Sequence, residues 1–199
     1  MQLSVLMDNT FIPMKKSQTP NQSIDYFPYF DGRYLSVAAS LNGGNVLQSV
    51  IQSLKSIVKT ITDIEVSDDQ IWDKIFESHN ISLSEKRNNK IVVKPTMFGE
   101  RHNPRLKASI VNISHSFGLN ELIEAFCEGL IDNILEMMTI DYLTSNRVQQ
   151  VIGTGTALLK IPLLRNALKT KLNIPLIYID GNDADVGAVW VAYHYYCNS

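Results

Sequence analysis

The chain has 199 residues, with 18 Lys and Arg against 20 Asp and Glu, a net charge of −2, and 45% apolar residues. This length is enough for one domain with a substantial core, and the near balance of charge argues against a nucleic-acid or anionic-membrane binder, whose surface is basic. No apolar run approaches the ~20 residues that span a bilayer, and the first residues do not resemble a signal peptide. The two cysteines, Cys127 and Cys197, suit neither a disulfide framework nor a zinc site, so we expect a cytoplasmic protein.

The first part of the chain predicts strands followed by helices. Weak alternation at residues 2–8 predicts a strand, and Asp31-Gly32 predicts a hairpin turn before a strand at residues 33–39. The apolar spacing from Asn45 to Thr60 predicts an amphipathic helix. A pair of acids at residues 68–69 suits the start of a second helix.

The second part of the chain alternates predicted strands with predicted helices. The expected strands are residues 91–93, 109–114, 148–152 and 175–180, and the expected helices are residues 120–138, 162–172 and 184–195. Asn120 is in place to cap the long helix, whose apolar rows repeat every four residues. The order is that of an α/β fold, with the closing strand–helix–strand unit parallel.

A Gly-x-Gly turn, Gly153-Thr154-Gly155, lies between a predicted strand and a predicted helix. Glycines let a backbone approach a ligand closely, and a helix N-terminus offers free N–H groups to an anion. The ligand that fits is a nucleotide; the alternative is a plain tight turn. No Walker loop is present. A Rossmann site, and with it a nicotinamide-dependent oxidoreductase, fits poorly because Leu158 stands where the third glycine belongs and too few residues follow Asp180.

A second pair of glycines, Gly43 and Gly44, also lies between a predicted strand and a predicted helix. We call each of these strand–glycine–helix turns a glycine corner. Two such corners in one domain can face each other across a single ligand. That both corners contact the same nucleotide is the central prediction from the sequence. The alternative for this segment is a simple exit from a hairpin into a helix.

Three other segments are candidates for chemistry. Asp183 and Asp185 suit a helix cap and first turn better than a metal site. Glu100 and Arg101, between prolines, predict a loop held by an ion pair, next to His102, for which a catalytic role stays open. Cys127 lies in mid-helix, where it is expected to pack as a small apolar side chain.

These segments together resemble the C-terminal half of the FGGY carbohydrate kinases. The residues that carry the resemblance are Tyr26–Phe30, Val37–Leu47, Gly99–His102, Gly153–Leu158 and Asp183–Ala188. Of these, the block from Val37 to Leu47 is similar to the branch of the family whose substrate is the ketose sedoheptulose. The likeness covers nearly the whole chain.

The resemblance implies an α/β fold: a single actin-like ATPase (ribonuclease H-like) domain over residues 1–199, with a mixed sheet flanked by helices. It implies an enzyme that phosphorylates a ketose, most simply sedoheptulose at its 7-position, with ATP and Mg²⁺. Gly44 and Gln48 match the position where the family's helix approaches the nucleotide phosphates, and Gly153, Thr154, Gly155 and Thr156 match the glycine-rich turn near the adenosine. No metal ligand is expected in this chain, and neither nucleic acid nor a membrane is an expected partner.

The chain is much shorter than a complete kinase of this family. The resemblance therefore implies that the N-terminal domain, with the general base and most of the sugar contacts, lies outside these 199 residues. We expect no catalytic residue here, and no turnover by this chain alone. The alternative is a non-catalytic binding or regulatory module that docks on a partner such as a separately encoded first domain.

Overall fold

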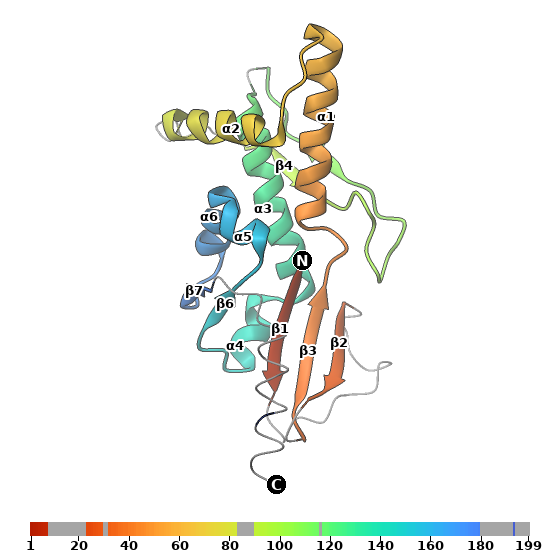
Figure 1. The fold of residues 1–199 in the computed structure, drawn as a ribbon. Coiled ribbons are helices and arrows are strands. Elements are labelled where there is room, and N and C mark those ends of the chain that lie inside the picture. Colours follow the sequence, from red (N-terminus) through yellow and green to blue (C-terminus); the bar gives the residue numbers. More distant parts are fainter. Residues whose placement is uncertain (8–22, 30–31, 83–89, 116, 180–192, 194–199) are drawn as a thin grey trace. The chain divides into compact units, whose positions relative to one another are not determined.

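The structure is a computed structural model that describes residues 1–7, 23–29, 32–82, 90–115, 117–179 and 193. The chain divides into two units, Met1–Val148 and Gln149–Ser199. Figure 1 shows the elements within each unit.

The first unit begins with an antiparallel sheet of three strands in the order β1-β3-β2 (Figure 1). Its strands are β1 (Gln2–Met7), β2 (Ile24–Pro28) and β3 (Tyr34–Ala39). The predicted hairpin is confirmed, because β2 pairs with β3 and Gly32 adopts a φ of +72° in the connection, a conformation that only glycine adopts easily. Val37 and Ala38 of β3 are buried, so the central strand anchors the sheet to the core.

Two helices follow, α1 (Gly44–Thr62) and α2 (Asp68–Ser82), as the sequence predicts. The apolar face of α1 is buried only over its first two turns, at Val46, Leu47, Val50 and Ile51. Farther along the same face, Ile57 and Ile61 are 53% and 76% exposed. The apolar repeat therefore continues beyond the part of the helix that other described residues cover.

A second pair of strands, β4 (Val92–Lys94) and β5 (Ser109–Val111), is antiparallel. The strand predicted at 109–114 ends early because Asn112 turns to a φ of +62°. The long helix α3 (Leu119–Met137) packs against β4, α1, α2 and β3. At Gly129 it lies so close to β4 that an added Cβ would be 2.2 Å from the carbonyl oxygen of Val93.

The prediction that Asn120 caps α3 is wrong. The helix starts one residue earlier, Gly118 is its N-cap, and the Gly118 N–H donates to the Glu121 carboxylate at 3.0 Å. The acid in the first turn bonds to the backbone ahead of the helix, so no Asx cap is needed. A short helix, α4 (Ile140–Ser145), was not predicted; Thr139 caps it through a hydrogen bond from the Tyr142 N–H at 3.2 Å.

The described part of the second unit contains two parallel strands, β6 (Val151–Gly153) and β7 (Leu176–Tyr178), with α5 (Thr156–Lys160) and α6 (Pro162–Lys171) between them in the chain. The predicted parallel pairing and the helix from Pro162 are confirmed. The helix expected at residues 184–195 lies outside the described residues, apart from residue 193.

Candidate functional site

The loop that leads from β3 into α1 is held by one buried carboxylate. Glu100 is fully buried. It accepts hydrogen bonds from the Ser40 hydroxyl at 2.6 Å and from the backbone N–H of Leu41 at 3.0 Å. The carboxamide groups of Asn42 and Asn133 donate to it at 2.8 and 2.7 Å. Four donors from two segments of the chain, residues 40–42 and Asn133, therefore converge on one side chain.

Asn42 ties the same loop to the backbone of the two residues directly before Glu100. Its carboxamide nitrogen donates to the Gly99 carbonyl at 2.7 Å, and its carboxamide oxygen accepts from the Phe98 N–H at 3.1 Å. Asn42 is fully buried, so these bonds satisfy groups that water does not reach. Two segments that carry the family resemblance, Val37–Leu47 and Gly99–His102, are thus joined in space.

The hydrogen bonds decide the charge of Glu100. Burial alone would raise the pKa of the carboxyl, but the bonds from Ser40, Asn133, the Leu41 backbone and Asn42 together lower the pKa below its ordinary value. Hydrogen bonds to the charged form favour ionisation. The carboxylate is therefore ionised at neutral pH and is stabilised by these hydrogen bonds.

The predicted ion pair between Glu100 and Arg101 is wrong. Within the described part of the chain, the partners of Glu100 are the four donors above, and Arg101 is exposed. The sequence analysis also missed Asn133. Its signal is an asparagine in register with the buried residues Gly129 and Met137 on the same row of α3, because a polar side chain on a buried helix face requires a partner.

At the N-terminus of α1, directly after this fixed loop, two backbone N–H groups have no acceptor among the described residues. Gly43 is its N-cap and has no side chain to offer, and no acid stands in the first turn. Among the described residues, none accepts a hydrogen bond from the N–H of Gly44 or Asn45, and both residues are exposed. Free N–H groups and the positive end of the helix dipole favour an anion at this position.

Gln48 lies one turn into α1, on the same face as Gly44. Its side chain is exposed, and its carboxamide nitrogen donates to the Asp68 carboxylate at 2.7 Å. Lys55 forms an ion pair with Asp68 at 2.6 Å. Hydrogen bonds from Lys55 and then Gln48 lower the pKa of Asp68. Asp68, the first residue of α2, therefore links the start of the second helix to the face of α1 that carries Gln48.

In the Gly-x-Gly corner of the second unit, close packing and backbone conformation explain the two glycines. An added Cβ at Gly153 would lie 2.8 Å from side-chain atoms of both Leu158 and Tyr178. Gly155 has a φ of +101°, with open space around it, and Thr154 and Thr156 are exposed. Gly153 is thus required for packing within the unit, and Gly155 for the direction of the backbone.

The six predicted nucleotide-contacting residues therefore fall into two groups. Gly44 and Gln48 lie in the first unit, and residues 153–156 lie in the second. That both corners contact the same nucleotide stays a prediction.

The other candidates are placed as follows. Cys127 is buried and has a free thiol, and burial raises its pKa to about 12, which confirms that it packs as an apolar residue. The described histidines His102 and His115 are exposed. Cys197 and the segment Asp183–Ala188 lie outside the described residues. In the part that the structure describes, no three His, Cys, Asp or Glu side chains cluster as metal ligands, and no helix is long and apolar enough to cross a membrane.

Comparison with solved structures supports the predicted fold. The chain is similar over its whole length to a ligand-bound xylulose kinase from Lactobacillus acidophilus, with 18% identity, a TM-score of 0.70 and 37% of that chain covered. A xylulose kinase from Rhodospirillum rubrum gives a TM-score of 0.72 at 15% identity, with 97% of this chain and 36% of that one covered. Since these chains are sugar kinases with the actin-like ATPase fold, the α/β prediction is confirmed. The class that this likeness defines is therefore one of fold alone, an α/β fold shared with these kinases.

Comparison with curated proteins gives more specific relatives. The chain is 34% identical to the sedoheptulokinase of Homo sapiens over 195 residues, which are 96% of this chain and 39% of the relative. It is 32% identical to the sedoheptulokinase of Mus musculus over the same shares. No protein-family model matches the chain. The predicted resemblance to FGGY carbohydrate kinases, and to a sedoheptulokinase in particular, is confirmed; the chain spans about two-fifths of the length of the curated relatives it matches.

Proposed function

We propose that this chain is the nucleotide-side domain of a carbohydrate kinase that transfers the γ-phosphoryl group of MgATP to a ketose, sedoheptulose, to give sedoheptulose 7-phosphate. The observation that carries the proposal is the anchored N-terminus of α1. Its free N–H groups at Gly44 and Asn45 suit phosphate oxygens, and the segment that holds them belongs to a chain 34% identical to a sedoheptulokinase.

Phosphoryl transfer depends mainly on positioning and on neutralising charge. The Glu100 network contributes to positioning, because it fixes the loop from Ser40 to Asn42 directly before the helix. The phosphates of MgATP lie at the N-terminus of α1 in this proposal, and Gln48 donates to them from one turn farther along. Residues 153–156 lie near the adenosine, and Mg²⁺ enters as part of the substrate.

The general base and most sugar contacts come, in this proposal, from a domain outside these 199 residues. Loss of a general base typically costs about 10²–10⁴ in rate, and loss of the sugar site costs more. The isolated chain should therefore bind MgATP in the millimolar range or more weakly and produce no sedoheptulose 7-phosphate. Substantial turnover by this chain would show that the base lies within it, and would contradict the division of roles.

The nucleotide site is tested by Gln48→Ala, with Gln52→Ala as the matched control. Both glutamines are exposed on α1, and both carboxamides donate to Asp68. Only Gln48 stands one turn from Gly44. In an NMR titration of the chain with MgATP, Gln48→Ala should weaken binding several-fold and Gln52→Ala should not. Equal effects of the two substitutions would assign them to the contact with Asp68, and would remove Gln48 from the nucleotide site.

A second candidate function is a non-catalytic module that docks on a partner. The exposed apolar side chains Ile57, Ile61 and Ile64 near the end of α1 favour it, since exposed apolar surface often marks an interface. Co-purification with an actin-like N-terminal domain, together with no response to MgATP, would support the module over the kinase.

A further inference from the structure

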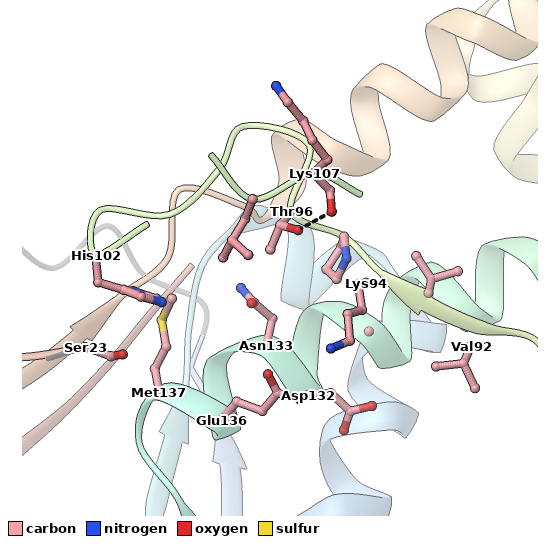
Figure 2. Close-up of a pocket in the computed structure, with 14 residues that line it drawn as sticks. Ser23, Val92, Lys94, Thr96, His102, Lys107, Asp132, Asn133, Glu136 and Met137 are labelled. Carbon is pink, nitrogen blue, oxygen red and sulfur yellow. Dashed lines mark hydrogen bonds between the residues drawn. The ribbon is translucent and has the colours of Figure 1, made fainter. Parts of the chain in front are cut away.

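The first unit contains a cavity with both charged and apolar residues in its lining, which the proposed nucleotide site does not use. It has a volume of about 320 Å³ and lies between β4, the loop from Thr96 to Lys107, and α3 (Figure 2). This volume is at the lower end of the range for small-molecule sites, about 300–1,000 Å³. Neither Gly44 nor Gln48 lines it.

Charges of both signs lie together on the α3 side of the cavity. Asp132 and Glu136 are one turn apart on that helix, and Figure 2 shows the Lys94 side chain of β4 directed toward them. Lys94 and Glu136 are exposed, and neither forms a hydrogen bond or ion pair with the described residues. The Lys107 ammonium is directed away from the cavity, and its carbonyl accepts a hydrogen bond from the Thr96 hydroxyl at 2.9 Å.

Asn133 adds an acceptor between these charges. Its carboxamide nitrogen is already committed, because it donates to Glu100 at 2.7 Å and to Ser40 at 2.9 Å. The carboxamide oxygen of Asn133 accepts no hydrogen bond from the described residues, and Asn133 lines the cavity. The orientation of this side chain is therefore fixed by the network that also holds the loop before α1.

The lining excludes several ligand classes. Two carboxylates repel a phosphate or another anion, and a nearby ammonium opposes a divalent cation. The imidazole of His102 is the only aromatic ring among the described residues that line the cavity, so a base or another flat ring has little aromatic surface to stack on. A ligand with widely separated charges also fits poorly, because the Lys94 side chain is directed toward the acids (Figure 2).

Vicinal hydroxyl groups match this arrangement. Each hydroxyl is both a donor and an acceptor, so a chain of them can donate to Asp132, Glu136 and the Asn133 oxygen while it accepts from Lys94. Hydrogen bonds to charged groups are the stronger ones. We propose that this cavity is a binding site for a neutral polyhydroxylated ligand, a sugar or sugar alcohol, held by Lys94, Asn133 and Glu136.

The test is an NMR titration of the chain with sorbitol and with sedoheptulose, in which backbone amide shifts are followed. The expected result is a saturable shift at Val93, Asn133 and Glu136 with at least one of the two. Lys94→Ala and Glu136→Ala should each weaken that binding about tenfold, which corresponds to ~1.4 kcal/mol. Both side chains lack partners among the described residues, so the variants should keep the unfolding temperature of the parent.

Glu77→Ala is the matched control, because Glu77 is an exposed acid on α2 that lies outside this cavity. It should leave the titration unchanged. Inorganic phosphate and glycine are run in parallel as an anion and a zwitterion. The proposal is wrong if neither polyol causes saturable shifts at these amides, if either small ion binds there in their place, or if the two variants bind as the parent does.

Discussion

The two glycine corners differ in what holds them. The corner before α1 is fixed by side chains, because Ser40, Asn42 and Asn133 converge on the buried Glu100. The corner after β6 is fixed by the absence of side chains, because Gly153 leaves room for Leu158 and Tyr178, and Gly155 permits a φ of +101°. The same sequence feature, a strand followed by glycines and a helix, is thus built by two mechanisms, and substitutions should separate them.

The largest effect is expected at Glu100. Glu100→Gln removes the charge and turns an amide N–H₂ group toward donors, so we expect a loss of about 2–4 kcal/mol in the free energy of unfolding. Urea denaturation measures it. Glu77→Gln is the control, because that side chain is 64% exposed, and it should change stability by less than about 0.5 kcal/mol. A loss at Glu100 no larger than that of the control would show that the network does not hold this corner.

Gly153→Ala should have the next largest effect. The new methyl group meets Leu158 and Tyr178 at 2.8 Å, and such overpacking costs about 1–3 kcal/mol. Gly118→Ala is the matched control, because that glycine has a φ of −111° and no atom within 4 Å of an added Cβ. Thermal unfolding of both variants measures the difference. If Gly153→Ala unfolds at the temperature of the control, the corner tolerates a side chain and the contrast between the corners fails.

The charge of Glu100 also predicts that the free energy of unfolding depends on pH. This effect should be smaller than that of substituting Glu100. The pKa of the carboxyl is lowered in the folded state, so its contribution is complete above the unfolded value of about 4.3 and is lost as pH falls through the folded pKa. Stability of the parent should therefore fall faster below about pH 4 than stability of Glu100→Gln. Parallel curves for the two proteins would mean that Glu100 is not preferentially ionised when folded.

The smallest effect is expected at Asp68. The contacts of this acid with Gln48, Gln52 and Lys55 lie at the surface, where ion pairs contribute about 0.2–1 kcal/mol. Asp68→Asn should therefore cost no more than that, and high salt should reduce the difference from the parent. A loss as large as that of Glu100→Gln would show that α2 is held to α1 mainly through this residue.

Much of the fold was predictable from local pattern. The hairpin at Gly32, the helix after Gly44 and the parallel pair of β6 and β7 each follow from periodicity and turn residues close together in sequence. The partners of Glu100 were not predictable in this way. Ser40 and Asn133 are distant in sequence, and the neighbouring Arg101 was the obvious but wrong partner. Buried polar networks depend on tertiary contacts that no local spacing encodes.

The candidate site was predictable only in part. The resemblance selected the six residues at the two corners, and the structure gives physical reasons for Gly153 and Gly155 that do not require a ligand. The free N–H groups at Gly44 and Asn45 depend on the absence of a capping side chain at Gly43, which the sequence does show. The role of Asn42 in fixing that loop required the three-dimensional structure.

The most direct test of the central claim is an NMR titration of the chain with MnATP, whose paramagnetic ion broadens the resonances of nearby amides. If both corners bind one adenine nucleotide, the amides of Gly44 and Gly155 should broaden together, with the same dependence on concentration. Broadening at one corner alone, or at neither, would contradict the shared nucleotide site.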